Sequence, residues 1–177
     1  MIRNDIEKSI GPTDADIWTG LVYISKNYLV FANALLTLYV LPKFASIYTF
    51  PNFKKELLSI YKTLMPLFFV GMLLIFIFKD FAISILFKGD YSAMSPLFKW
   101  QLMGDFVRLL SVILATQFLA KKMVRNFIFT ELLSHALFFG FSLFFIQKLG
   151  IVGVVVAHFV RYVLYFMIVL FLSLIHI

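Results

Sequence analysis

Two ionisable residues, Asp105 and Arg108, lie within the otherwise almost entirely apolar stretch from Tyr91 to Leu119. Charged side chains inside a membrane-spanning segment are rare and costly, and they commonly serve transport or proton transfer. A spacing of three residues places both side chains on one face of a helix, within reach of each other. The sequence therefore predicts an intramembrane ion pair. It is either a lock between helices or part of a path for a charged group.

A second set of polar residues recurs at helical spacing within the apolar segment 17–41. Its members are Thr19, Tyr23, Lys26, Asn33 and Thr37. Their intervals match one face of a helix. Lys26 lies about nine residues into the segment, roughly 14 Å at 1.5 Å per residue, which is too deep for its amine to reach the interface easily. We interpret the stripe as the wall of a water-filled cavity. The alternative is that its side chains hydrogen-bond neighbouring helices.

The last two apolar segments also carry isolated polar side chains. Arg161 lies in the middle of its segment, where an unpaired guanidinium is very costly, so we expect it to face a cavity or an acid on another helix. Glu131 lies near a segment end and is expected to be a solvated acid at the membrane interface. His135 is expected to be a hydrogen-bonded packing residue, with a proton relay as the alternative.

Enzymatic chemistry finds no support in the sequence. His158 precedes Arg161 by three residues, but no metal-binding pair of histidines, nucleophile motif or glycine-rich phosphate loop accompanies it. We therefore expect no reaction, no metal site and no organic cofactor. The chain has no cysteine, which excludes disulfides and thiolate nucleophiles.

The composition places these residues in a membrane. Hydrophobic residues make up 62% of the 177 and charged residues 14%, whereas soluble domains carry about 25% charged residues. At about 20 apolar residues per span, the length accommodates about five helices and no soluble domain. The net charge of +7 is scattered over short loops rather than gathered on one surface, so we expect no nucleic-acid partner.

We predict an all-α integral membrane protein with about five transmembrane helices. A polar outer segment, residues 1–16, precedes a helical bundle, residues 17–174, with spans at about 17–41, 63–87, 97–120, 127–147 and 151–174. Pro42 is expected to end the first span. The basic connectors at 43–62 and 121–126 are expected to lie in the cytoplasm, with the N-terminus outside. An outer start and an apolar end suggest a fragment of a longer chain.

One motif resembles a known family. The segment from Trp100 to Asp105 reads WQLMGD, Arg108 follows three positions later, and YSAM begins upstream at Tyr91. Further matching pieces are Ile24-Ser25 with Tyr28-Leu29, YVLP at 39–42, KDFAI at 79–83 and Ala120-Lys121. Over about residues 3–171 the chain resembles Wzx-type lipid-linked oligosaccharide flippases, the enterobacterial common antigen and O-antigen translocase group of the polysaccharide exporter superfamily. At Lys26 that family more often carries an acid.

The resemblance implies a fold and a function. It implies that the chain corresponds to five helices of the C-terminal half-bundle of a twelve-helix exporter with a central cationic cavity in the bacterial inner membrane. The implied function is translocation of an undecaprenyl-diphosphate-linked oligosaccharide for cell-surface polysaccharide biosynthesis, including lipopolysaccharide. Membrane lipid and the polyprenyl-diphosphate-linked glycan are the implied ligands, and polysaccharide polymerase and ligase proteins are the expected partners.

A diphosphate that crosses a low-dielectric core needs fixed positive charge. Our candidates for the substrate path are Lys26, Asn33, Asp105, Arg108 and Arg161, and for the coupling ion Asp105 and Glu131. Two alternatives remain open. A multidrug antiporter of the same superfamily would need acids rather than bases in the cavity. A scaffold subunit that does not transport would use the same polar groups only to associate helices.

Overall fold

The computed structural model describes residues 2–176 of the chain. Its elements, in order, are α1 (Ile2–Ile10), α2 (Pro12–Leu35), the π-helical segment η1 (Leu36–Val40), α3 (Leu41–Ala45), α4 (Phe50–Ile77), α5 (Lys79–Leu86), the 3₁₀ segment η2 (Ser92–Leu97), α6 (Phe98–Ala120), α7 (Val124–Leu149) and α8 (Ile151–His176). Within the described part, five helical stretches are long and apolar enough to cross a membrane: Pro12–Ala45, Phe50–Ile77, Ser92–Ala120, Val124–Leu149 and Ile151–Ile175. The prediction of an all-α membrane bundle is confirmed.

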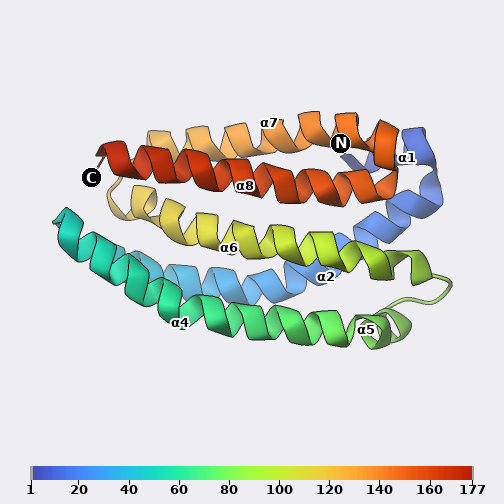
Figure 1. Ribbon diagram of the computed structural model, residues 1–177, viewed down its shortest axis with the longest axis horizontal. Coiled ribbons are helices and arrows are strands. Elements are labelled where there is room, and N and C mark those ends of the chain that lie inside the picture. The colour runs from blue at the N-terminus through green and yellow to red at the C-terminus, as the bar shows by residue number, and fades with distance from the viewer. Residues whose placement is uncertain (1, 177) are drawn as a thin grey trace.

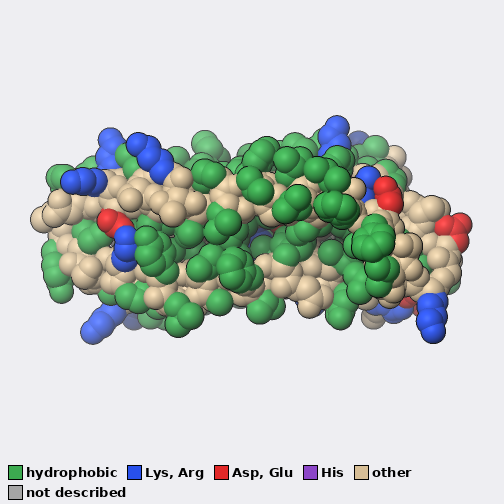
Figure 2. Space-filling model, turned by 90° about the horizontal axis from the view of Figure 1, so that it is seen from below, with side chains coloured by type: hydrophobic (Ala, Val, Ile, Leu, Met, Phe, Trp, Pro, Cys, Tyr) green, Lys and Arg blue, Asp and Glu red, His purple; other side chains and the backbone are tan. Residues whose placement is uncertain are grey.

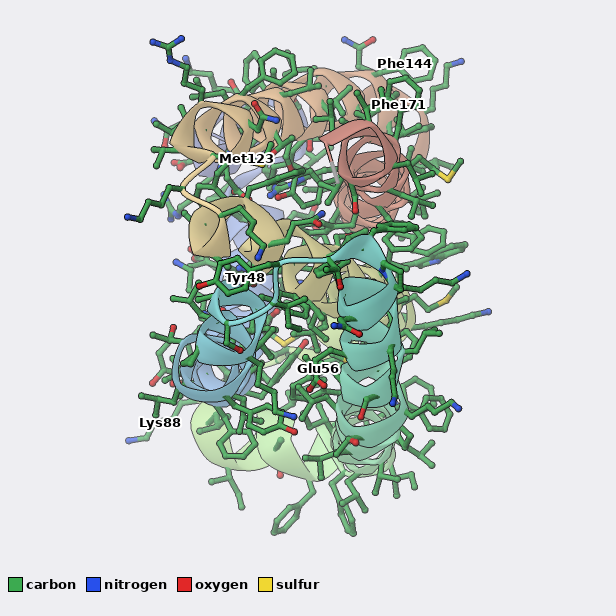
Figure 3. All side chains as sticks on the ribbon, turned by 90° about the vertical axis from the view of Figure 1, so that its left-hand side faces the viewer. Tyr48, Glu56, Lys88, Met123, Phe144 and Phe171 are labelled. Atoms are coloured by element: carbon green, nitrogen blue, oxygen red, sulfur yellow. The ribbon has the colours of Figure 1, made fainter. Side chains whose placement is uncertain are left out.

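The five long helices run side by side in an elongated bundle with α6 at its centre (Figure 1). α8 packs along α6, and α7 packs along α8. On the other side of α6 lie α2 and α4. Figure 3 looks along the helices from the end that carries Tyr48 and Met123, and it shows α7 and α8 in one layer, α6 in the middle, and α2 and α4 in the other layer.

The two basic connectors lie at the same end of the bundle (Figure 1). Lys121, in the turn between α6 and α7, lies 5.3 Å from the ring centroid of Tyr48, which lies between α3 and α4. α1, α5 and the turn between α7 and α8 lie at the opposite end. In Figure 2, charged side chains gather near the two ends, and hydrophobic side chains cover much of the length between them. This distribution suits a protein whose middle contacts lipid and whose ends contact water.

The first span is longer than expected because Pro42 does not end it. Instead, η1 widens the helix, and the Leu41 N–H donates to the carbonyl of Leu36, five residues back. A π turn already interrupts the regular ladder of hydrogen bonds. Pro42, which lacks an N–H, therefore falls where the ladder restarts, in the first turn of α3, and the helix continues to Ala45.

Three other segments differ from the expected elements. The polar lead-in forms α1, which buries Ile6 against Ala15, Ile146 and Val154. Most of the connector 43–62 belongs to α4, which begins at Phe50. The second span ends at Ile77, and α5 continues separately from Lys79.

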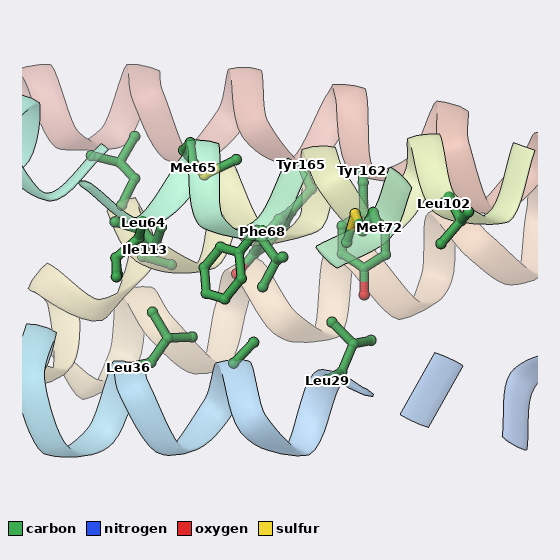
Figure 4. Close-up of a cluster of buried hydrophobic side chains, with 14 of the residues drawn as sticks. Leu29, Leu36, Leu64, Met65, Phe68, Met72, Leu102, Ile113, Tyr162 and Tyr165 are labelled. Carbon is green, nitrogen blue, oxygen red and sulfur yellow. The ribbon is translucent and has the colours of Figure 1, made fainter. Parts of the chain in front are cut away.

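The core of the bundle is apolar and lies between the two layers (Figure 4). α2 contributes Leu29 to it, and η1 contributes Leu36. α4, α6 and α8 contribute Leu64, Phe68, Met72, Ile113 and Tyr165. The polar residues of interest lie around this core.

Candidate functional site

Asp105 is the centre of a polar cluster where α2, α6 and α8 meet. Its side chain is fully buried. One carboxylate oxygen, Oδ2, accepts hydrogen bonds from the hydroxyls of Ser25 and Tyr28 on α2 and from the side-chain amide of Gln101, 3.1 Å away on α6. The other oxygen, Oδ1, lies 2.9 Å from Nε2 of His158 on α8. We call these five residues the Asp105 cluster.

The sequence builds this cluster through helical spacing and one glycine. Gln101 and Asp105 are one turn apart on α6, and Ser25 and Tyr28 are one turn apart on α2, so each pair shares a helix face. Gly104 lets α8 approach closely, because a Cβ atom there would clash with the His158 ring and would lie 3.3 Å from the Cα of Phe159. The cluster is therefore a built junction of three helices.

The predicted ion pair between Asp105 and Arg108 is wrong. In the described part of the chain, Arg108 makes no salt bridge within 4.0 Å. Asp105 is instead paired with His158, whose imidazole is a cation only when it is protonated. The two carboxylate oxygens already accept from donors on α2, α6 and α8, whereas the guanidinium of Arg108 lies 5.7 Å from the ring centroid of Tyr162. Sharing a helix face put the two residues near each other, but neighbouring helices supplied better partners.

Arg161 is buried, and no acid among the described residues lies at contact distance from it. It donates to the Ser134 hydroxyl on α7 and to the Tyr162 hydroxyl, each at 2.8 Å. Its guanidinium lies 4.4 Å from the Tyr162 ring centroid and 5.2 Å from that of Phe138. We expected a cavity or an acid on another helix, and the observed partners are hydroxyls and aromatic faces. Because Arg108 also lies over Tyr162, two guanidinium groups share one aromatic ring.

Glu131 and His135 lie on α7. Glu131 is half-buried and accepts a hydrogen bond of 2.6 Å from the Tyr165 hydroxyl, so it joins α7 to α8 instead of being a fully solvated acid. His135 is exposed, and its ring lies 2.8 Å from the backbone carbonyl of Glu131 on the same helix. The structure therefore gives His135 a hydrogen bond, as expected, but no packed environment.

The polar stripe on α2 and η1 lies on an exposed face. Lys26 and Asn33 are both exposed. The hydroxyls of Thr19 and Thr37 donate to Ala15 and Asn33 carbonyls of their own helix, at 2.7 and 3.0 Å. No stripe residue is seen to bond to another described helix, so the alternative that these groups hold helices together within this chain is wrong.

A groove of about 200 Å³ runs beside this stripe. Asn33 and Thr37 form one wall, and Thr116 of α6 and Phe127 of α7 form the other side. Lys26 lies seven residues before Asn33, two turns along the same stripe, and Arg108 lies four residues before Val112, another lining residue. The groove adjoins the end of the stripe that carries Asn33 and Thr37, and most of its remaining lining is apolar.

Sequence reasoning gave no role to three members of the Asp105 cluster. Ser25 and Tyr28 drew attention only as part of a family resemblance, and His158 only as a possible catalytic residue. A usable signal was present, since Ser25 and Tyr28 are three residues apart on the face of α2 that points away from Lys26. Among the described residues, no group of three His, Asp or Glu side chains is placed to hold a metal ion.

Comparisons with known proteins give two relatives. The chain is 27% identical to the lipid III flippase of Escherichia coli K12 over 166 residues, which is 94% of this chain and 40% of that protein. The lipid III flippase of Shigella flexneri gives the same values. The chain therefore spans less than half the length of these relatives. No family model and no solved structure matches it.

These relatives agree with the resemblance carried by the WQLMGD segment, whose Asp105 and Gln101 lie at the centre of the cluster. The five long apolar helices also confirm the prediction of a multi-pass protein of the inner membrane. By sequence, this chain is similar to transporters that flip lipid-linked precursors across the membrane, as its motifs predicted.

Proposed function

We propose that this chain is part of a flippase that moves a polyprenyl-diphosphate-linked glycan from the cytoplasmic to the outer leaflet. The observation that carries the proposal is positive charge without an acid in contact, in the middle of an apolar bundle. Arg108 and Arg161 both lie against Tyr162, and neither makes a salt bridge within the described residues. The names of the two relatives support the same class of activity.

Guanidinium groups suit a diphosphate for a physical reason. A cation in low dielectric is stabilised when an anion reaches it, and the planar guanidinium offers paired donors that match phosphate oxygens. Arg161 already uses two donors on Ser134 and Tyr162, which fixes its orientation. Arg108 makes no hydrogen bond that the structure shows, so its donors are available. The polyprenyl tail needs no such help because it can stay in lipid.

The exposed stripe supplies the wall of the proposed path. Lys26, Asn33 and Thr37 are exposed on one face of the first span, and Asn33 and Thr37 line the groove beside α6 and α7. An ammonium facing lipid at this depth would be costly, whereas one facing a water-filled cavity is tolerated. We propose that parts of a longer protein, which the relatives' greater length makes room for, enclose this face. Lys26 then adds a fixed positive charge to this wall.

The finer assignments are predictions. The relatives' name specifies lipid III, and we extend to this chain only the class of a polyprenyl-diphosphate-linked glycan. Common antigen or O-antigen repeats are the glycans that the resemblance implies, and polymerase and ligase proteins the partners. Asp105 and Glu131 are the candidates for binding the coupling ion, because each is hydrogen-bonded to a side chain on another long helix.

Binding to the chain in lipid nanodiscs tests the proposal directly. We expect undecaprenyl diphosphate to bind and neutral undecaprenol to bind much more weakly. Replacing Arg108 by Ala is expected to weaken diphosphate binding about tenfold, the equivalent of one charge-assisted hydrogen bond. Lys148→Ala is the matched control, since this lysine is exposed near the end of α7 over the Phe144 ring. Equal affinity in Arg108→Ala, Lys148→Ala and the unchanged chain would contradict the proposal.

Glycan export tests it in a cell. This chain replaces the matching segment of the Escherichia coli flippase in a strain that lacks the flippase's own gene, and the surface glycan is measured. Lys26→Ala and Arg161→Ala are expected to abolish export at an unchanged protein level. Loss of the protein itself in both variants would instead support a scaffold role for these side chains.

A further inference from the structure

Asp105 and His158 form a buried acid–base pair between α6 and α8. The carboxylate is fully buried, and the imidazole side chain is 13% exposed. Oδ1 and Nε2 are 2.9 Å apart, which is the distance of a hydrogen bond that holds one proton between them. We infer that this pair is a proton-binding site, and that it, rather than Glu131, binds the coupling proton of the proposed transporter.

The partners of Asp105 favour a proton over a metal ion. A sodium ion is held by several oxygen ligands, but Oδ1 faces a ring nitrogen. Oδ2 faces the Gln101 amide nitrogen at 3.1 Å and the hydroxyls of Ser25 and Tyr28. These groups donate hydrogen bonds to a carboxylate and leave no shell of free oxygens. A proton needs only the acceptor oxygen or the imidazole nitrogen.

The ionisable groups around the pair come from three helices. Tyr28 of α2 donates to the carboxylate, Tyr162 of α8 packs edge-on against the His158 ring at 5.0 Å, and Arg108 of α6 lies over Tyr162. On α7, the ring centroid of Phe138 lies 6.1 Å from that of the imidazole. α4 turns Tyr61 toward the Leu110 carbonyl, away from the pair. Arg108 and Arg161, whose guanidinium groups both lie over the Tyr162 ring, are thus the nearby fixed charges, and both oppose a positive charge on His158.

The same carboxylate ties α2 to the rest of the bundle. Ser25 and Tyr28 both donate to Oδ2, so α2 is held at this level by hydrogen bonds to a charged acceptor. Such bonds are roughly twice as strong as those to a neutral acceptor. When protons fill the pair and Asp105 becomes neutral, the hold on α2 weakens. Because α2 also carries Lys26 and Asn33, proton binding would change the position of the proposed substrate wall.

Titration of His158 tests the site. In a background with His135 and His176 replaced by Gln, His158 is the remaining imidazole of the three in the sequence, and nitrogen NMR follows its protonation in nanodiscs. Asp105→Asn is expected to lower the pH midpoint of this signal by about one unit, a tenfold loss of proton affinity, because a neutral amide no longer stabilises imidazolium. Tyr28→Phe is expected to move the midpoint upward, because the carboxylate loses a donor and attracts the proton more strongly.

The opposite signs separate a proton site from a merely structural one. General loosening of the fold would shift both variants in the same direction. The inference is overturned if the midpoint is the same in all three proteins, if both shifts have one sign, or if His158 does not titrate between pH 4 and 9. If Asp105→Asn fails to fold, Tyr28→Phe still decides, since it keeps the carboxylate and must raise the midpoint.

A distance measurement tests the coupling to α2. The chain has no cysteine, so spin labels can be placed at the exposed Val30 of α2 and Met103 of α6. Uptake of the first proton charges His158 and leaves Asp105 ionised, so we expect the distance between labels to broaden or lengthen only at pH values below the His158 midpoint, where a second proton neutralises Asp105. Asp105→Asn is expected to abolish this response. An identical response in Asp105→Asn would overturn the coupling.

The inference rests on the proposed flippase function only for the use made of the proton. Titration of His158 needs no substrate, and diphosphate binding needs no proton. If the chain binds diphosphate but the His158 midpoint does not shift as expected in the variants, the proton site is wrong and the flippase proposal stands. The reverse result would sink the flippase proposal alone.

Discussion

On α2, Ser25 and Tyr28 point into the bundle and donate to Asp105, whereas Lys26 and Asn33 point outward and bond to no other helix in the described chain. These residues alternate within three turns of one helix. The inward pair joins three helices through one carboxylate. The outward stripe borders a groove and leaves its amine and amide without partners.

The inward polar groups hold the bundle together, whereas the outward polar groups have no partner in the described chain and are free to contact water, substrate or another part of the protein. A buried polar group must find its hydrogen bonds within the fold, because water does not reach it. An exposed ammonium at membrane depth is tolerated only if water, substrate or another part of the protein meets it. We therefore expect substitutions at the Asp105 cluster to lower stability as well as to change proton binding, and those on the stripe to affect function without lowering stability.

The largest effect is expected from Asp105→Ala. It removes the acceptor shared by Ser25, Tyr28, Gln101 and His158, and it leaves buried donors without partners. We expect the free energy of unfolding to fall by about 3 kcal/mol. Unfolding in mixed micelles with increasing SDS measures it. The control is Asp80→Ala, whose carboxylate is 68% exposed and whose loss is expected to change stability by less than about 0.5 kcal/mol.

A smaller but clear loss is expected from Gly104→Ala. The added methyl group would clash with the His158 ring and press on the Phe159 backbone, at a cost of about 1–3 kcal/mol. Gly140→Ala on α7 is the matched control, because its Cβ would meet nothing within 4 Å. That variant should gain about 0.5–1 kcal/mol, since alanine suits a helix better than glycine. Equal effects of the two substitutions would show that α6 and α8 are not closely packed here.

Much of this arrangement follows from the sequence, and the remainder depends on packing between helices. Hydropathy alone locates five spans, because a helix of about 20 apolar residues matches the thickness of the hydrocarbon core of a bilayer. The partner of Asp105 could not be read in this way. Within one helix, Arg108 is the obvious partner, but helices far apart in the sequence bring Tyr28 and His158 closer. The π turn before Pro42 was equally hidden, because its cause is local geometry and not composition.

A third carboxylate, Asp90, shows how an acid behaves outside the bundle. Hydrogen bonds from the Ser92 hydroxyl at 2.6 Å and the Ser92 amide at 3.0 Å lower the pKa of Asp90 below its usual range. A lowered pKa in the folded state means that the bonds stabilise the loop above about pH 4 and are lost as the pH falls through the folded pKa. Hydrogen exchange of the Ser92 amide, corrected for its intrinsic pH dependence, should therefore speed up in acid.

Asp90→Asn is expected to remove this pH dependence without changing global unfolding, because the loop is exposed. A Ser92 amide that stays equally protected from pH 6 to pH 3 would contradict the assignment. Asp105 and Asp90 thus differ in how much of the fold each stabilises. The Asp105 carboxylate joins three helices, whereas the Asp90 carboxylate closes one turn.

The smallest effect on stability is expected from Lys26→Ala. Its ammonium is exposed and makes no ion pair within the described residues, so unfolding should change by less than about 0.5 kcal/mol. Asn33→Ala should behave alike, since it lies on the same stripe. If Lys26→Ala destabilised the chain as strongly as Asp105→Ala, the two faces of α2 would both be structural, and the stripe would lose its place in the proposed path. A stable Lys26→Ala variant that no longer binds diphosphate would instead show that the charge of Lys26 serves substrate binding and is not needed for folding.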